Sequence, residues 1–199
     1  YSDRFVWIPF YLSFLFVMFK NFPIKVVLTT LVVISLIIAF CDQTASGLLK
    51  PLIGRMRPSN LDNPISPLVH VVQGYRGGRF GFPSSHAANS WSMAFFAMYL
   101  VRRSKLTAFL CFWALLTSYS RMYLGVHYFG DIVVGTLIGF IYATIHYYIF
   151  QHFLRKYTDG FKPTHHLKYS YVPILTGLLS IWMIICASGI FCHYGVDLR

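Results

Sequence analysis

Glutamate is absent from the chain, and six aspartates supply all of its acidic side chains. Only 12% of the 199 residues are charged, about half of the ~25% that is usual in soluble domains. So few charges argue against a soluble globular enzyme and against a disordered tail. Instead, 56% of the residues are hydrophobic and the mean hydropathy is +0.58. The composition therefore indicates an integral membrane protein.

The chain also has no CxxC pair and no cysteine–histidine spacing of the kind that binds zinc. Its four cysteines lie in or at the end of apolar stretches, where thiols pack as small hydrophobic groups. Seven lysines and ten arginines give a net charge of +11. In so apolar a chain, this charge favours contact with membrane lipids over binding of nucleic acid.

Six apolar segments predict an all-α polytopic membrane bundle of about six transmembrane helices in a single membrane domain, 1–199. The segments span 5–19, 24–49, 87–101, 106–119, 132–150 and 172–192. The fifth and sixth reach the length of about 20 residues that a spanning helix needs. The second also fits if Lys25 and Asp42 lie near its two ends.

Basic residues are unevenly shared between the turns. If the helices alternate in direction, the turns 20–25, 102–105 and 155–168 share one side and carry nine Lys and Arg against one Asp, a net +8. The rest of the chain carries a net +3. The positive-inside bias places the first set in the cytoplasm, so the loops 50–86 and 121–131 face outward. We therefore expect a multi-pass protein of the inner cell membrane, with these loops at the extracytoplasmic interface.

Three polar clusters lie in or beside the two outward loops. They read Lys50-x6-Arg57-Pro58, Pro83-Ser84-Ser85-His86 and Ser120-Arg121-x5-His127-x3-Asp131. Lysine, arginines, hydroxyl groups and a helix start can together surround a tetrahedral oxyanion. His127 and Asp131 are four residues apart and so share a helix face, where the carboxylate can orient the imidazole as a nucleophile or base.

The three clusters together resemble the signature of the type 2 phosphatidic acid phosphatase superfamily, and the resembling core covers about 28–150. The run 74–82 looks most like that of small bacterial membrane members. The resemblance implies that His127 attacks phosphorus to form a phosphohistidine, that Asp131 orients it, and that His86 protonates the leaving oxygen and then activates water. It also implies a phosphate-binding set of Lys50, Arg57, Ser84, Ser85 (through its backbone) and Arg121. We expect no cofactor and no metal, because the outer loops have no acidic cluster to hold one.

Two features depart from the family pattern. Ser85 stands where the second motif usually has glycine, which is tolerable if its φ is negative, as at a helix start. Only two helices precede Lys50, where membrane members usually have three, so we expect an N-terminal helix to be missing. The segment at about 171–192 is then an additional C-terminal helix.

The remaining polar residues have weaker interpretations. Arg76 and Arg79 are possible contacts for a headgroup or second phosphate, and with Arg55 they could equally be interfacial anchors. Asp42, two helical turns before Lys50, is expected to be a structural partner of Lys50 or Arg57. The glycine-rich run 74–81 is expected to cover the site.

The predicted activity is hydrolysis of a lipid phosphate, with undecaprenyl diphosphate or a lipid A phosphate favoured as substrate. Phosphatidylglycerophosphate or phosphatidate is the alternative within the same class. A lipid transporter that binds the anion without turnover is the alternative from another class, although it should place its site near the midplane between repeated halves. A vanadate-dependent peroxidase is disfavoured by the six apolar segments.

Overall fold

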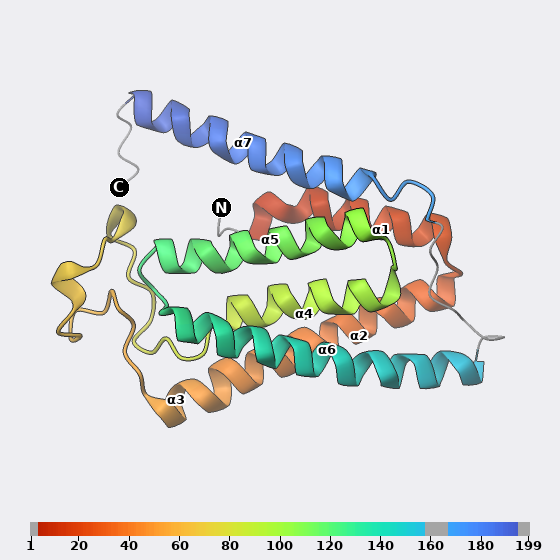
Figure 1. The fold of residues 1–199 in the computed structure, drawn as a ribbon, viewed down its shortest axis with the longest axis horizontal. Coiled ribbons are helices and arrows are strands. Elements are labelled where there is room, and N and C mark those ends of the chain that lie inside the picture. The colour runs from red at the N-terminus through yellow and green to blue at the C-terminus, as the bar shows by residue number, and fades with distance from the viewer. Residues whose placement is uncertain (1–3, 158–166, 195–199) are drawn as a thin grey trace.

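The computed structural model describes residues 4–157 and 167–194 and contains six long helices (Figure 1). They are α1 Ile8–Asn21, α2 Ile24–Asp42, α4 Ser85–Leu100, α5 Ser104–Tyr123, α6 Phe129–Tyr157 and α7 Val172–Tyr194. The short elements are η1 Arg4–Trp7, η2 Gln43–Leu49, α3 Lys50–Ile53, η3 Ser66–Leu68 and η4 Val72–Gly74. The described ranges contain no strand, only an isolated bridge between Met56 and Phe80. The all-α prediction is confirmed, and each long helix coincides with one of the six apolar segments.

The second apolar segment forms one continuous helix, because α2 runs through η2 into α3. Within it η2 is a π-helix, a wider turn that often occurs at functional sites. The helix ends at Gly54, whose φ of +65° suits a residue without a Cβ and whose N–H donates to the Lys50 carbonyl oxygen at 3.0 Å. The sharp turn lets the following loop, with Arg57, fold back toward α6.

α4 and α6 approach each other closely at two glycines of α6. A Cβ at Gly135 would lie 2.5 Å from the Ser84 carbonyl oxygen, and one at Gly139 would lie 2.5 Å from the Ala88 carbonyl oxygen. A Gly-x3-Gly spacing is typical of closely packed membrane helices. The contact brings the starts of the two helices together, and the Ser84 N–H donates to the Asp131 carbonyl oxygen at 3.0 Å. This hydrogen bond places the sequence cluster that contains Ser84 next to the one that contains Asp131.

α1 packs between α5 and α7. The ring of Phe10 on α1 has its centroid 5.6 Å from that of Trp113 and 5.7 Å from that of Phe109, both on α5. On the other side of α1, the hydroxyl groups of Ser13 and Thr176 lie 2.8 Å apart and tie α1 to α7. The predicted C-terminal segment therefore forms a helix that packs mainly on α1 and also contacts α5 (Figure 1).

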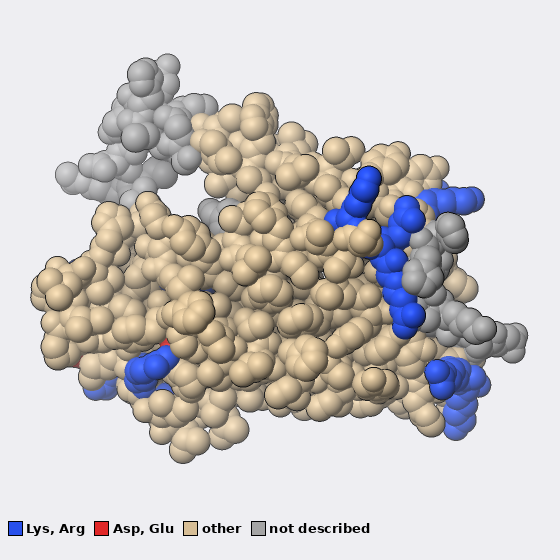
Figure 2. Space-filling model, viewed as in Figure 1, with Lys and Arg blue, Asp and Glu red and all other residues tan. Residues whose placement is uncertain are grey.

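Charged side chains on the face shown in Figure 2 gather at the two ends of the bundle, and the surface between them is uncharged. The α1–α2 and α4–α5 turns and the C-terminal end of α6 lie at one end, whereas α3, the following loops and the α5–α6 connection lie at the other (Figure 1). The helices Ile24–Ile53 and Phe129–Tyr157 are long and apolar enough to cross a bilayer, and Phe5–Asn21 and Val172–Ala187 are apolar but shorter. Large apolar side chains are widely exposed, as expected of a surface that faces lipid.

Candidate active site

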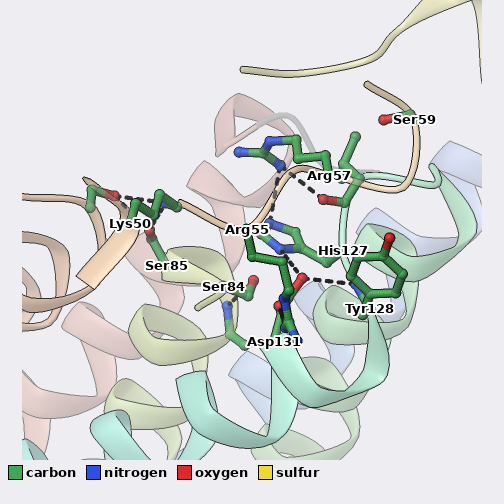
Figure 3. Close-up of polar contacts among 12 residues, drawn as sticks. Lys50, Arg55, Arg57, Ser59, Ser84, Ser85, His127, Tyr128 and Asp131 are labelled. Carbon is green, nitrogen blue, oxygen red and sulfur yellow. Dashed lines mark hydrogen bonds and ion pairs between the residues drawn. The ribbon is translucent and has the colours of Figure 1, made fainter. Parts of the chain in front are cut away.

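The three sequence clusters meet at one end of the bundle (Figures 1 and 3). The first comes from α3 and the loop after it, the second from the start of α4, and the third from the end of α5 through the first turn of α6. His127 lies in the connection between α5 and α6, with Arg57 on one side and Asp131 on the other (Figure 3). The fold thus assembles residues that are up to 81 positions apart, from Lys50 to Asp131.

Asp131 holds the His127 ring from beneath. Its carboxylate is fully buried, and Oδ2 lies 3.2 Å from Nδ1 of His127. The same oxygen accepts a hydrogen bond from the Tyr128 backbone N–H at 2.8 Å. A buried carboxylate fixed by a backbone donor is a rigid acceptor, so it keeps the Nδ1 proton on the ring and sets the ring's orientation.

Arg57 contacts the opposite nitrogen of the same ring. Its Nη1 lies 3.2 Å from Nε2 of His127 and donates to the Val126 carbonyl oxygen at 3.2 Å. A guanidinium can only donate, so Nε2 must accept and carries its lone pair. The two neighbours together select the tautomer with the proton on Nδ1. Nε2 is therefore the ring nitrogen that carries the lone pair, and it faces the guanidinium of Arg57.

The pKa of His127 reflects how many cationic groups surround it. Burial, first of all, and then the nearby charges of Arg57, Arg121 and Lys50 together with His86 lower this pKa from its usual 6.5 to about 2. Burial and the charge of Arg121 likewise lower the pKa of Arg57. The ring is consequently neutral at physiological pH, which a nucleophile requires. Repulsion among these groups also makes the site favourable for an anion.

Two of these arginines have unmet donors. Nε of Arg57 and Nε of Arg121 are both buried without a hydrogen-bond partner. The Arg121 side chain is almost fully buried, and its Nη2 makes only a long contact of 3.5 Å with the Tyr75 hydroxyl. Buried donors without acceptors are costly. A phosphoryl group would supply the missing acceptors.

Lys50 and Ser85 form a second polar cluster beside the first. Lys50 Nζ donates to the Ser85 hydroxyl at 2.6 Å and to the Ser46 hydroxyl at 2.9 Å. Ser84 caps α4, because its hydroxyl accepts from the Ala87 N–H at 3.3 Å. Ser85 begins the helix, and it is not among the residues with positive φ. Serine is thus accommodated in place of the expected glycine, and its side chain positions the lysine.

His86 lies one residue further along α4 and is exposed. It lines a cavity of about 900 Å³ together with Asp42 from α2 and Asn89 from α4. The Asp42 carboxylate accepts only a long hydrogen bond from Ser46, at 3.4 Å. The expected partnership of Asp42 with Lys50 runs through Ser46, whose hydroxyl donates to Asp42 at 3.4 Å and accepts from Lys50 Nζ at 2.9 Å. Arg57 contacts His127 instead.

Arg76 and Arg79 occupy the loop that folds over the site. Arg76 Nη1 donates to the Ser59 carbonyl oxygen at 2.7 Å and to the Ser66 hydroxyl at 2.9 Å. Arg79 lies over the Phe80 ring, and its carbonyl oxygen accepts from the Arg57 N–H at 3.2 Å. These contacts bind the glycine-rich run to the loop that carries Arg57. Headgroup contact by either arginine stays a prediction.

Arg55 is a site residue that the sequence analysis did not identify as such. Its guanidinium forms an ion pair with Oδ1 of Asp131, the oxygen that His127 leaves free. The guanidinium also lies over the rings of Phe82, at 4.5 Å from the centroid, and Tyr128, at 5.2 Å. A sequence signal existed, because a buried carboxylate with one oxygen committed to histidine needs a donor for the other.

The part of the chain that the structure describes brings together no group of three or more His, Cys, Asp or Glu side chains able to hold a metal ion. The charges available to neutralise a phosphoryl group there are those of lysine and arginine. Independence from metal stays a prediction.

An all-helical apolar fold with a neutral, oriented histidine among buried cations defines an enzyme that acts on phosphate esters at a membrane. The chain belongs to the PAP2 superfamily, whose model matches residues 26–155. A lipid A 4'-phosphatase of Bacteroides thetaiotaomicron is 44% identical over 94% of this chain and 85% of the relative. One of Porphyromonas gingivalis is 33% identical over 82% and 69%, and an undecaprenyl-diphosphatase of Sulfolobus acidocaldarius is 30% identical over 70% and 61%. The family and these relatives make the chain a membrane lipid phosphatase.

Proposed function

We propose that this enzyme hydrolyses a phosphate monoester of a lipid A-type glycolipid. The reaction passes through a phosphohistidine at His127 and needs no metal ion. The observation that carries the proposal is the pair of contacts that fix the His127 ring, with Asp131 at Nδ1 and Arg57 at Nε2. The substrate class is supported by the two lipid A 4'-phosphatases that match most of the chain.

In the first step, Nε2 of His127 attacks phosphorus and the bond from phosphorus to the lipid oxygen breaks. His86 gives a proton to that oxygen, so the lipid leaves as a neutral alcohol. Lys50, Arg57 and Arg121 bind the phosphoryl oxygens, with Ser84 and Ser85 at the start of α4 completing the phosphate site. The Nδ1 proton stays shared with Asp131, which stabilises the charge that develops on the ring.

In the second step, His86, now neutral, removes a proton from water. The water oxygen attacks phosphorus, the phosphorus–nitrogen bond breaks, and inorganic phosphate leaves. Both steps need positioning and charge neutralisation more than covalent assistance. The cationic side chains supply that neutralisation in place of a divalent ion.

The lipid tail has a place to lie beside the site. The cavity at His86 shares Tyr11, Met93 and Trp113 with a smaller, apolar cavity of about 150 Å³ that extends between α1, α2, α4 and α5. A phosphate at His127 and chains among these helices would match an amphipathic substrate.

The proposed arrangement in the membrane is six spans, with the active site at the extracytoplasmic face of the inner membrane. It is supported by the concentration of Lys and Arg at the end of the bundle opposite the site (Figures 1 and 2). The long apolar helices Ile24–Ile53 and Phe129–Tyr157 would supply two of the spans.

The test is phosphate release in detergent with EDTA present, from lipid A, undecaprenyl diphosphate and phosphatidylglycerophosphate in parallel. We expect release, fastest from lipid A, and a loss of about 10⁴-fold or more in His127→Ala. His146→Ala is the matched control, because His146 is also buried but lies in the middle of α6. Release that required a divalent ion, or that survived in His127→Ala, would contradict the mechanism. Specific binding of lipid without turnover would favour a transporter.

A further inference from the structure

The cavity beside His86 has a polar wall that the phosphate chemistry does not use. Its lining includes Asp42 from α2 and Asn89 from α4, together with aromatic side chains from η1, α1 and α5. His86 and Asn89 are three residues apart on α4 and so share a helix face, with Asn89 one turn further into the bundle. Asp42 lies eight residues before Lys50 in the continuous helix, a distance of about 12 Å along its axis.

Both side chains present hydrogen-bond acceptors that the protein leaves largely unmet. Oδ1 of Asn89 is buried and has no hydrogen-bond partner. The Asp42 carboxylate accepts one contact, from Ser46 at 3.4 Å, and within the described residues it forms no ion pair. The other carboxylate of the site is the opposite case, since Asp131 accepts from Arg55, His127 and Tyr128. The acceptors of the cavity are therefore available to a ligand.

The two acceptors lie in the cavity next to His86, where the leaving group of the reaction would be released. His86 is the proton donor to the lipid oxygen, so the alcohol must pass next to His86. The same cavity holds His86, Asn89 and Asp42. Groups attached near the phosphoester oxygen would therefore enter the cavity that the two acceptors line. A sugar would present hydroxyl or amide N–H donors there, whereas a polyprenyl chain has none.

The charge of the leaving group also distinguishes a prenyl diphosphate from a sugar phosphate. When a diphosphate is cleaved, the leaving group is itself a phosphate with negative charge. That charge would enter a cavity lined by the Asp42 carboxylate and would be repelled. A sugar hydroxyl leaves as a neutral alcohol and avoids the repulsion.

We propose that Asp42 and Asn89 form an acceptor site for the hydroxyl or amide donors of a sugar leaving group, and that this site selects a phosphorylated glycolipid over a prenyl diphosphate. The inference rests on the proposed lipid phosphatase function and narrows its substrate. Asp42 contributes in two ways, because it accepts donors from the sugar and repels an anionic leaving group. Asn89 contributes only as an acceptor.

The kinetic test compares kcat/KM for lipid A and for undecaprenyl diphosphate in the wild type, Asp42→Leu and Asn89→Leu. For lipid A we expect both variants to lose about 10–100-fold, the effect of one hydrogen bond to a charged or buried group. For undecaprenyl diphosphate we expect Asn89→Leu to change little and Asp42→Leu to gain. Thr117→Val is the control, because Thr117 lines the same cavity from α5 and should leave the ratio of the two substrates unchanged. Equal losses on both substrates would overturn the acceptor site.

A binding test separates this inference from the phosphatase function. A dephosphorylated glucosamine-disaccharide lipid and undecaprenol are titrated separately against the protein, and tryptophan fluorescence is followed because Trp7 and Trp113 line the cavity. The wild type and His127→Ala should both bind the sugar lipid about tenfold or more tighter than undecaprenol. Asp42→Leu should abolish that preference. Equal affinities for the two alcohols in the wild type would overturn the acceptor site even if phosphate release were normal, and inactivity with the preference intact would count only against the phosphatase function.

Discussion

The two walls of the active site differ in how completely their polar groups are partnered. The nucleophile wall is made of Arg55, Arg57, His127 and Asp131. Its histidine and aspartate are buried, its arginines are half-buried, and each carboxylate oxygen of Asp131 has a partner. The leaving-group wall, made of His86, Asn89 and Asp42, lines a cavity of about 900 Å³ and has hydrogen-bond acceptors without a full set of partners. The first wall is organised for a step that is the same for every phosphate ester. The second meets the part of the substrate that varies.

A substitution in the leaving-group wall should lower the rate by an amount that depends on the leaving group of the substrate. We predict that His86→Ala lowers the rate on a lipid phosphate by about 10²–10⁴-fold, since a positioned acid contributes that much. With p-nitrophenyl phosphate, whose phenolate leaves without a proton, phosphohistidine formation should be nearly normal. Rapid-quench kinetics measures both. His70→Ala, in the loop between η3 and η4, is the control. Equal losses with the two substrates would contradict the acid role.

A substitution in the nucleophile wall should lower the rate by a similar factor for every leaving group. Arg55→Gln leaves Oδ1 of Asp131 without its ion pair, so the carboxylate no longer holds the His127 ring in one orientation. We predict a fall in kcat of about 10–100-fold with little change in KM, because misplacement of a reacting group carries costs of this order. Arg55→Lys should restore part of the rate. A rise in KM with kcat unchanged would instead make Arg55 a substrate contact.

The contact of α4 with α6 joins the two walls. Its contribution is tested by the thermal stability of the protein rather than by the reaction rate. In Gly139→Ala the new Cβ would lie 2.5 Å from the Ala88 carbonyl oxygen and 2.9 Å from the Ser92 nitrogen. We predict that the unfolding midpoint in detergent falls by about 3–10 °C, from overpacking of about 1–3 kcal/mol. Leu137→Ala is the control, since Leu137 is exposed on the same helix. An unchanged midpoint in Gly139→Ala would mean that the helices separate without cost.

The smallest expected effect concerns pH. The pKa of His127 is lowered to about 2 by burial and the surrounding cations, whereas in the unfolded chain it is about 6.5. Below pH 6.5 the unfolded state binds the proton and the folded state does not, so acid favours unfolding. The free energy of unfolding should fall by about 1 kcal/mol more between pH 6.5 and 5.5 in the wild type than in His127→Gln. Parallel curves for the two proteins would show that the ring is protonated in the folded state.

The sequence was sufficient for the helices, because runs of apolar residues must be buried or face lipid whatever their tertiary partners. It also identified the residues around His127, since their types and spacing carry the chemistry. The pairing of Arg55 with Asp131 was missed, because it joins residues 76 positions apart and depends on how the loop turns at Gly54. The role of Ser46 in linking Asp42 to Lys50 was missed for a related reason. The π-turn and Ser46 decide which groups Lys50 reaches, and residue spacing alone does not reveal them. The Gly-x3-Gly spacing of Gly135 and Gly139 is visible in the sequence, but its role in the contact of α4 with α6 became clear only from the structure.

The central claim is that Nε2 of His127 becomes covalently phosphorylated. It is tested most directly by rapid alkaline quench of the enzyme with ³²P-labelled lipid A in EDTA, followed by peptide mapping at alkaline pH. The account predicts a transient, acid-labile and base-stable label on the peptide that contains His127, longer-lived in His86→Ala and absent in His127→Ala. Turnover in the wild type with no label at any time, or a label that persists in His127→Ala, would contradict it.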